Sequence, residues 1–514
     1  MGCTTILAGI KATYDGSTMI ARNDDSGAEG FTPKRLEIVT PERQPRHYRS
    51  VLSHVEVDLP DNPMRYSAVP NALEGRGIWA GAGVNAANVA MTATETICSN
   101  ERVLGADPLV FYIPADGDEP EQPGGIGEED LVTLVLPYIR SAREGVLRTG
   151  ELLARYGTYE MNGIAFSDVR EIWWMETIGG HHWIARRVPD DRYVVMPNQS
   201  GIDHFDLADA FGEKKEYLCS PDLREWMRDN YLDLTMDPSP CTGRDGEAEN
   251  NPSRVFNPRD AFGTHTDADR LYNTPRAWYI CRCLNPRTYT WDGPEAEYGP
   301  MDDDLPWSLR PEKKITVEDI KYLLSSHFQG TPHDPYGTAG DEFTRRAFRT
   351  IGINRTDFLA LLQLRPYMPE EICALEWLTY GSNAFNSFAP LYPNVGDVPA
   401  YLSRTCQNIE TDSFYWNCRL LGVLADAQFQ RNKIHVERYQ IRTMARAHEI
   451  LNRYDKMIVQ KTEEGAPDGG TDSIREAANE ELAAMMREET REVLSIVLDE
   501  ASKGMKNAYD RSDA

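Results

Sequence analysis

The segment from Cys3 to Asp25 constrains the fold of this chain more than any other. An apolar, β-branched run follows Cys3, residues 14–17 have a turn sequence, and a second apolar run at residues 18–21 ends in Arg22 and Asp25. Two such runs around a turn predict a β-hairpin. The hairpin would bring Arg22 and Asp25 back beside Cys3, so that a thiol, a guanidinium and a carboxylate share one small space.

This grouping suits nucleophilic catalysis by Cys3. A thiol attacks well only after it loses its proton, and a neighbouring cation or base makes that loss easier. An α-amine, with an ordinary pKa of about 7.7–8.0, could be this base near neutral pH. Cys3 would carry that amine only if residues 1–2 were a removed propeptide. We expect an aminopeptidase to remove Met1, and Cys3 to attack the carbonyl of Gly2.

Two other interpretations of the same residues stay open. Met-Gly-Cys also begins signals for myristoylation of glycine and palmitoylation of cysteine. However, Ile6 stands where such signals carry serine or threonine, and no polybasic segment follows. A cysteine in a first strand is also often a buried structural residue, because free cysteine behaves as a small apolar side chain.

The residues just described resemble a known family. Met-Gly-Cys-Thr-Thr-Ile at residues 1–6 and Tyr-Asp-Gly-Ser-Thr-Met-Ile-Ala-Arg-Asn-Asp-Asp at residues 14–25 are similar to the start of the bacterial dipeptidase A family. These are cysteine peptidases of the N-terminal-nucleophile (Ntn) hydrolase superfamily, related to bile salt hydrolases, penicillin V acylases and secernins. The resemblance implies an α+β fold, a four-layer αββα sandwich, over residues 3–435.

A glycine-rich segment at residues 77–96 predicts a second hairpin, with its turn at residues 85–88. A dinucleotide-binding loop is disfavoured, because the residues after Asn88 are typical of a strand rather than a helix. The segment resembles a family motif that has glycine where this chain has Asn88, which tolerates a left-handed backbone. Glu95 is a candidate for binding a substrate ammonium group. A solvated or cross-strand-paired carboxylate is the alternative.

Residues 163–202 predict three adjacent strands, in the segments 171–177, 179–185 and 188–199. His181 and His182 would point to opposite faces of a strand and so make a poor metal site. We expect His182 to line the substrate site or to be structural. Asn198 ends the third strand, and the resemblance to bile salt hydrolases implies that its amide stabilises an oxyanion. A turn-forming asparagine is the alternative.

Arg276 lies in a segment, residues 272–278, that resembles another family motif. The resemblance implies that Arg276 is the second arginine of the catalytic pocket. The alternatives are a clamp for a substrate carboxylate, which suits a bidentate guanidinium, and a surface ion pair. Downstream, the alternation of Cys281 and Cys283 fits one face of a strand.

The other elements are predicted from periodicity and capping. Helices are expected at residues 131–139 and 145–156. Thr316 and Asp319 mark the start of another helix. Two more helices are expected at residues 436–461 and 473–508, joined by a linker at 463–472. Residues 203–260 are expected to form acidic loops and short helices, and residues 349–378 short strands. We expect residues 436–514 to be a helical extension that serves packing or assembly, and the protein to be a homo-oligomer.

Composition excludes several classes of protein. The 514 residues carry a formal net charge of −27, which disfavours nucleic acids and anionic membranes as partners. The sequence contains no run of about 18 apolar residues, so no membrane span is expected. The cysteines are scattered without a CxxC pair, so neither a disulfide framework nor a structural metal site is expected. We expect a cytoplasmic enzyme without metal or cofactor.

The residues and the resemblance together predict a dipeptidase. Cys3 would attack the peptide carbonyl to form a thioester, its α-amine would pass the proton to the leaving amine, and Asn198 would hold the oxyanion. Arg22 and Asp25 would orient and polarise the nucleophile. Two alternatives remain: an acylase that cleaves non-peptide amides with the same residues, and a non-enzymatic, secernin-like interaction protein.

Overall fold

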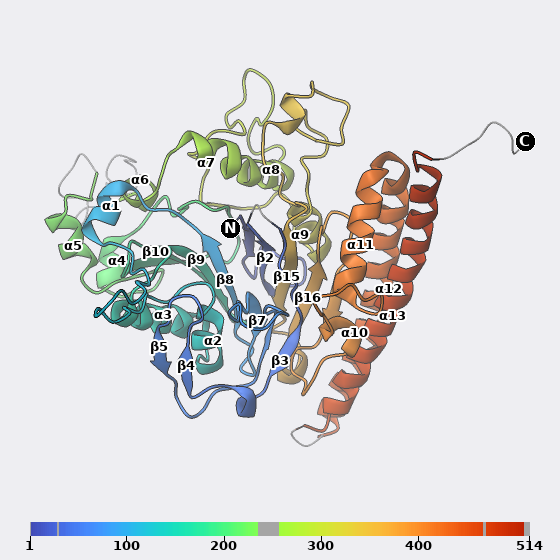
Figure 1. Ribbon diagram of the computed structural model, residues 1–514, viewed down its shortest axis with the longest axis horizontal. Coiled ribbons are helices and arrows are strands. Elements are labelled where there is room, and N and C mark those ends of the chain that lie inside the picture. The colour runs from blue at the N-terminus through green and yellow to red at the C-terminus, as the bar shows by residue number, and fades with distance from the viewer. Residues whose placement is uncertain (1, 28–29, 235–255, 466–468, 508–514) are drawn as a thin grey trace, which may run out of the picture.

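The computed structural model describes residues 2–27, 30–234, 256–465 and 469–507 (Figure 1). Met1 of the expected propeptide lies outside these residues. So do part of the acidic region at 203–260, part of the linker at 463–472 and the last residue of the helix expected at 473–508. No helix in the described ranges is long and apolar enough to cross a membrane.

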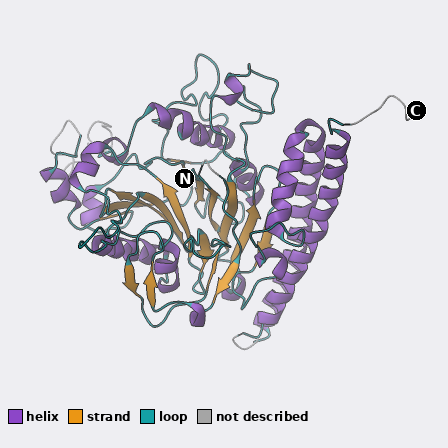
Figure 2. Ribbon diagram, in the orientation of Figure 1, coloured by secondary structure: helices purple, strands orange, loops and turns teal. Residues whose placement is uncertain are grey.

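Two antiparallel sheets form the centre of the molecule (Figure 2). The first is seven-stranded, in the order β14 (Ser308–Leu309), β12 (Tyr193–Met196), β1 (Thr4–Ala8), β2 (Thr18–Asp25), β15 (Thr356–Leu364), β16 (Ala374–Tyr380) and β17 (Ala389–Leu391). The second is six-stranded, in the order β13 (Tyr217–Cys219), β11 (His182–Arg187), β10 (Ile172–Ile178), β9 (Asn162–Ser167), β8 (Ala90–Thr96) and β7 (Ala82–Val84). The α+β class expected from the sequence is confirmed.

The hairpin predicted at the start of the chain is present. β1 and β2 pair antiparallel with Thr5 opposite Arg22, and every residue of both strands is buried. Successive side chains of a strand point to opposite faces, and Thr5 and Arg22 both contact residues of β8 in the other sheet. Asn23 instead donates to Leu324 on the far side, at 2.8 Å. The register of one hairpin therefore decides which side chains enter the space between the sheets.

Helices cover the outer faces of both sheets. α3 (Ala142–Tyr156) packs against β9, β10 and β11, whereas α8 (Thr274–Leu284) packs against β12 and α9 (Val317–Leu324) against β1 and β2. The two sheets face each other through β2, which packs on β8 and β9. The predicted capping box is present at the start of α9, where Thr316 and Asp319 bond reciprocally. Buried apolar side chains fill the space between these layers.

The remaining elements are short. Two small sheets pair β3 (Glu37–Val39) with β6 (Tyr66–Ala68) and β4 (His47–Arg49) with β5 (Glu56–Asp58). The short helices are α1 (Glu101–Ala106), α2 (Leu131–Val135), α4 (Leu207–Phe211), α5 (Leu223–Asp229), α6 (Pro258–Phe262), α7 (Asp267–Tyr272) and α10 (Ala400–Ser403). The predicted turn between β7 and β8 contains Asn88 at a φ of 54°, the left-handed conformation that asparagine tolerates.

Two predictions about elements are wrong. The expected third strand, β12, is not adjacent to β10 and β11 but lies in the seven-stranded sheet beside β1. Cys281 and Cys283 belong to α8 rather than to a strand, because alternation over so few residues does not distinguish the two structures. The pairing of β12 with β1 matters for function, because it places Asn198, which follows β12, near the start of β1.

Three helices lie side by side at the C-terminal end of the described chain: α11 (Phe414–Ala427), α12 (Phe429–Glu463) and α13 (Asp472–Lys503) (Figure 1). A buried ion pair joins α12 to the residue that follows β15, with Arg365 donating to Asp455 at 2.6 and 3.1 Å. α12 runs continuously through residue 435, so the predicted domain boundary falls within a helix and stays a prediction.

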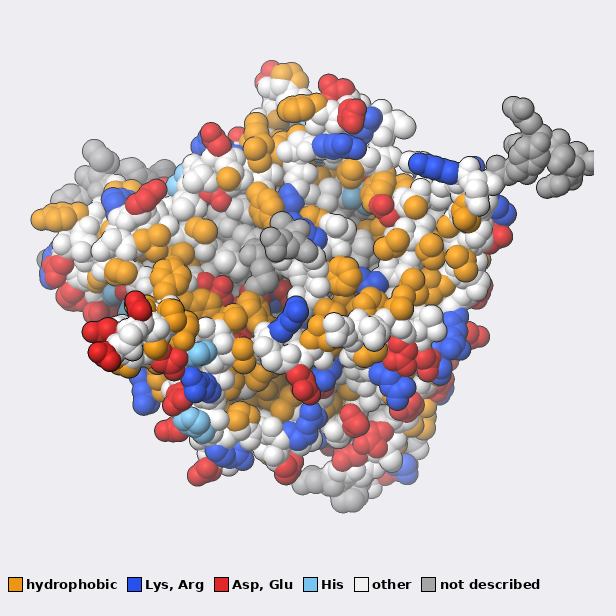
Figure 3. Space-filling model, viewed as in Figure 1, with side chains coloured by type: hydrophobic (Ala, Val, Ile, Leu, Met, Phe, Trp, Pro, Cys, Tyr) orange, Lys and Arg blue, Asp and Glu red, His pale blue; other side chains and the backbone are white. Residues whose placement is uncertain are grey.

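On the face shown in Figure 3, side chains of both charges are interspersed with apolar ones.

Candidate active site

Cys3 lies directly before β1, and its side chain is fully buried beside Arg22 of β2. Arg22 Nη2 lies 3.1 Å from Cys3 Sγ, and neither residue is exposed to solvent. The hairpin accounts for this contact, because antiparallel pairing sets Arg22 opposite Thr5, whose side chain points the same way as that of Cys3. The predicted proximity of the thiol and the guanidinium is therefore present in the structure.

Arg22 is the centre of a buried charge cluster. Its Nη2 also contacts Asp24 Oδ1 at 3.2 Å and Glu128 Oε1, and its Nη1 donates to the carbonyl oxygen of Ala93 at 2.8 Å. Cys3, Asp24 and Glu128 offer ligand atoms within 4.8 Å of one another, a spacing that could hold a metal ion. The guanidinium touches all three of these atoms, so a cation already occupies the position that a metal would take.

The environment keeps the Cys3 thiol protonated. Burial raises the pKa of Cys3 well above its ordinary value, and Glu95, Asp24 and Glu128 add to this effect, against the lowering effect of Arg22. Burial alone would lower the pKa of Arg22, but Cys3 and the carboxylates raise it overall, so the guanidinium stays charged. A thiol in this state needs a base to remove its proton before it attacks a carbonyl.

Asp25 contacts a residue that the sequence analysis did not single out. Its carboxylate forms an ion pair with Arg349 Nη2 and accepts a hydrogen bond from Thr356 Oγ1 at 2.6 Å. The same Arg349 nitrogen donates to the carbonyl oxygen of Gly2 at 2.5 Å. Asp25 is therefore tied to the backbone before Cys3, rather than to the thiol.

Arg276 of α8 is fully buried, so the alternative of a surface ion pair is wrong. Its Nη1 contacts the carbonyl oxygen of Cys3 and donates to Thr4 Oγ1 at 2.9 Å. Its Nη2 donates to Asn198 Oδ1 at 2.9 Å and to Asn273 Oδ1 at 2.6 Å. Because Asn198 Oδ1 accepts from Arg276, its Nδ2 is left to point toward Glu95 Oε2, at 3.3 Å. Arg276 therefore orients the amide of Asn198 as a donor within the cluster.

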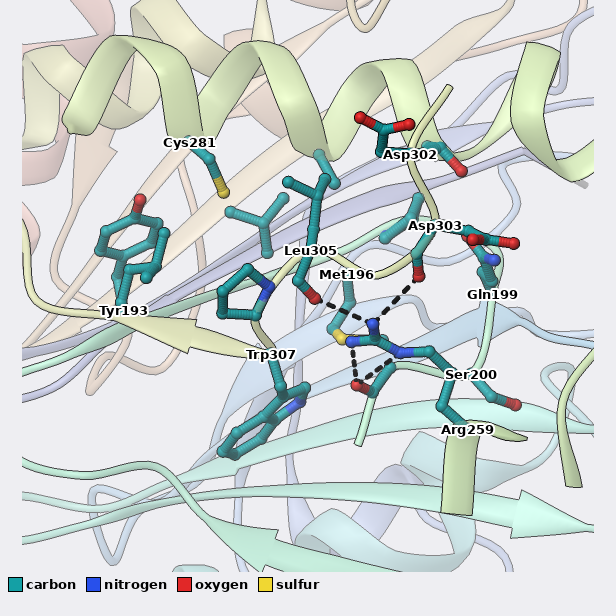
Figure 4. Close-up of a pocket in the computed structure, with 17 residues that line it drawn as sticks. Tyr193, Met196, Gln199, Ser200, Arg259, Cys281, Asp302, Asp303, Leu305 and Trp307 are labelled. Atoms are coloured by element: carbon teal, nitrogen blue, oxygen red, sulfur yellow. Dashed lines mark hydrogen bonds between the residues drawn. The ribbon is translucent and has the colours of Figure 1, made fainter. Parts of the chain in front are cut away.

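The loop that carries Asn198 is held from two sides. Glu176 Oε1 accepts from the backbone N–H of Gly201 at 2.8 Å, and Arg259 donates to the Gly201 carbonyl at 2.6 and 3.2 Å. Arg259 also bonds to backbone carbonyls in residues 303–305, beside a cavity of about 40 Å³ below α8 (Figure 4). Cys3 is not among the residues that line this cavity, so the cavity is a neighbour of the cluster and not its entrance.

Glu95 lies inside the cluster rather than in solvent. It is fully buried and accepts a hydrogen bond from Thr5 Oγ1 at 2.6 Å, across the space between the two sheets. Burial raises the pKa of Glu95 to about 8, although Arg22 and Thr5 act in the opposite direction. The carboxyl group is therefore largely protonated at neutral pH, and the alternative of a solvated carboxylate is wrong.

This shift predicts how Glu95 affects stability. The pKa of Glu95 is about 8 in the folded protein, against an ordinary value of 4.5. The contribution of Glu95 to the free energy of unfolding is therefore full below about pH 4.5 and is lost as the pH rises through 8. From pH 5 to 8, the free energy of unfolding of the wild type should fall relative to Glu95→Gln, on the order of 4 kcal/mol in total. Urea unfolding at several pH values measures this. The exposed Glu437→Gln is the control, and a difference between wild type and Glu95→Gln that stays constant with pH would contradict the assignment.

His182 belongs to a different group of residues. Its Nδ1 lies 2.7 Å from Asp107 Oδ2, and its ring stacks on Trp226 with centroids 4.0 Å apart. His181 Nδ1 lies 2.8 Å from Asp107 Oδ1, so the prediction that the two rings diverge is wrong. Only His182 lies in β11, and the preceding turn directs His181 to the same carboxylate. None of these partners contacts Cys3 or Arg22.

Four residues of the cluster were missed: Asp24, Glu128, Asn273 and Arg349. Asp24 is next to Asp25, and alternation along β2 could have placed it on the side of Arg22. Glu128 stands shortly before α2 in the chain, and its carboxylate is buried against Arg22. Asn273 lies three residues before Arg276 and is bonded to it, so helical spacing could have indicated it. Arg349 reaches the cluster only through the tertiary fold.

Comparison with known proteins agrees with this geometry. The model of peptidase family C69 matches residues 2–442. The chain belongs to peptidase family C69. It is 52% identical to a dipeptidase of Bifidobacterium longum over all of both chains and 49% identical to a probable dipeptidase A of Streptococcus pyogenes, again over all of both. It is 40% identical to dipeptidase A of Lactobacillus helveticus over 99% of each chain. The predicted resemblance to the dipeptidase A family is therefore confirmed.

Proposed function

We propose that this family C69 peptidase is a dipeptidase whose nucleophile is Cys3, activated by its own α-amine after the residues before it are removed. The observation that carries the proposal is the contact of 3.1 Å between Cys3 Sγ and the buried Arg22 guanidinium, at the very start of β1. The relatives named dipeptidase support the substrate class. Two facing antiparallel sheets with helices on their outer faces support the assignment to the Ntn hydrolases.

In the proposed reaction, Cys3 Sγ attacks the carbonyl carbon of the peptide bond and its proton passes to the α-amine. The amine then protonates the leaving amino group, and a thioester remains that water hydrolyses. Burial raises the pKa of the Cys3 thiol, which supports the need for such a base. Arg22 stabilises the thiolate as it forms, because its Nη2 lies 3.1 Å from the sulfur.

The surrounding residues have distinct proposed roles. Asn198 Nδ2, which Arg276 orients, donates to the oxyanion. Asp25, held by Arg349 and Thr356, positions the backbone before Cys3 and later its amine. Glu95, which is largely protonated in the free protein, ionises when the ammonium group of the substrate binds beside it, because a neighbouring cation lowers the pKa of a carboxyl group. His182, bonded to Asp107 and stacked on Trp226, has the structural role rather than the substrate-lining one.

The test combines the mass of the purified protein with its substrate preference. We expect a chain that begins at Cys3 and that hydrolyses dipeptides with a free amino group but not their N-acetylated forms, because acetylation removes the charge that Glu95 binds. Preference for acyl amides would favour the acylase alternative. Hydrolysis by a chain that still carries Gly2 would contradict the role of the α-amine.

A further inference from the structure

Two arginines hold the two carbonyl groups on either side of the Cys3 α-carbon. Arg349 Nη2 donates to the Gly2 oxygen at 2.5 Å, and Arg276 Nη1 contacts the Cys3 oxygen. The Gly2 carbonyl belongs to the peptide bond whose cleavage would free the amine of Cys3. The ring of Tyr272 contacts both guanidinium groups, with its centroid 5.2 Å from each.

The space around Gly2 admits no side chain. A Cβ at residue 2 would overlap the hydroxyl oxygen of Tyr272 and lie 3.0 Å from its Cζ. Tyr272 would have to move, but it is packed against Arg349, which is paired with Asp25, and against Arg276, whose Nε donates to the Tyr272 carbonyl at 2.9 Å. Although burial acts to raise the pKa of Tyr272, Arg349 and Arg276 lower it overall, so the hydroxyl lies in a strongly positive environment.

We propose that Arg349 and Tyr272 form the site at which the chain cleaves its own Gly2–Cys3 bond. Arg349 holds the oxygen of the carbonyl that is attacked, and the Tyr272 hydroxyl restricts the residue before Cys3 to glycine. This inference rests on the proposed function, because it requires Cys3 as the nucleophile.

The cleavage needs no other reactant than water. Cys3 Sγ attacks the Gly2 carbonyl carbon, the C–S bond forms, the C–N bond between Gly2 and Cys3 breaks, and the thiol proton passes to the leaving nitrogen. The negative charge that develops on the Gly2 oxygen lies against the Arg349 guanidinium, a charge-assisted hydrogen bond. Water then hydrolyses the thioester, which restores the thiol and releases the preceding residues as a carboxylic acid.

The test follows the intact mass of the full chain over time after cell-free synthesis. The informative change is Gly2→Ala, because residue 2 is absent from the released chain and cannot alter its activity. We expect the wild type to reach a chain that begins at Cys3, and Gly2→Ala to be released at least about tenfold more slowly, which corresponds to a barrier higher by about 1.4 kcal/mol. Alanine and glycine both allow removal of Met1, so the two precursors are matched.

A second substitution separates the steric effect from general damage. Tyr272→Phe removes the oxygen that an alanine Cβ would overlap but leaves Cζ at 3.0 Å, so it should restore part of the release rate in the Gly2→Ala chain. Arg349→Met should slow release of the wild-type sequence about a hundredfold, and Arg349→Lys should recover part of that loss by keeping the charge. A residue that only stabilised the fold would give neither recovery.

Release of Gly2→Ala at the wild-type rate, or no recovery with Tyr272→Phe, would overturn the role of Tyr272. An unchanged rate in Arg349→Met would overturn the role of Arg349. A chain cut directly before Cys3 by an added site-specific protease distinguishes this inference from the proposed function. If the proposed function is wrong, this chain hydrolyses no dipeptide. If only this inference is wrong, this chain keeps its dipeptidase activity.

Discussion

Replacing Cys3 with alanine is expected to abolish dipeptide hydrolysis, with a loss of about 10⁴-fold or more in kcat/KM, the scale seen when a nucleophile is removed. The substitution removes only the sulfur, which is the atom that bonds to the substrate in the proposed mechanism. Steady-state assays on free dipeptides measure the loss. Intact mass should also show that this variant keeps Gly2, because the same sulfur is the nucleophile in the proposed cleavage of the Gly2–Cys3 bond.

The matched control is Cys418→Ala. Cys418 is equally buried, at 0% exposure, but it lies in α11, away from Arg22. Both variants should lose a similar, small amount of stability in thermal unfolding, because each loses one buried sulfur. Only Cys3→Ala should lose hydrolysis. If Cys3→Ala kept activity in a preparation free of other peptidases, the proposed mechanism would be wrong.

Replacing Arg22 with methionine is expected to cost both stability and activity. The substitution would leave the buried carboxylates of Asp24 and Glu128 without the guanidinium between them. Removal of one partner from a buried ion pair typically costs about 3–5 kcal/mol. Urea unfolding measures this loss. Hydrolysis by the folded fraction should fall as well, because no cation would stabilise the Cys3 thiolate.

Arg365→Met separates these two effects. Arg365, directly after β15, also belongs to a buried ion pair, with Asp455 of α12, but that pair does not touch Cys3. The two variants should lose stability to a comparable extent, whereas Arg365→Met should keep its activity per folded molecule. Equal activity of the two folded variants would show that Arg22 is structural and that the contact with Cys3 Sγ has no role in catalysis.

The sequence by itself determined the features that depend on near neighbours. The Cys3–Arg22 contact follows from one hairpin, because turn position and strand alternation set the register without help from the rest of the chain. The capping box of Thr316 and Asp319 is equally local. The long C-terminal helices follow from helical composition interrupted by a linker rich in glycine and acidic residues.

Only the tertiary structure decided what surrounds that hairpin. β12 could not be assigned to a sheet from its own residues, because a buried strand has the same pattern in either sheet. Its pairing with β1 is what brings Asn198 to the cluster. Glu128 and Arg349 come from distant segments, and their burial beside Arg22 and Asp25 depends on how the layers pack. Local periodicity carries no information about such long-range contacts, so the position of Cys3 beside Arg22 was predictable, whereas the contacts of Glu128 and Arg349 were not.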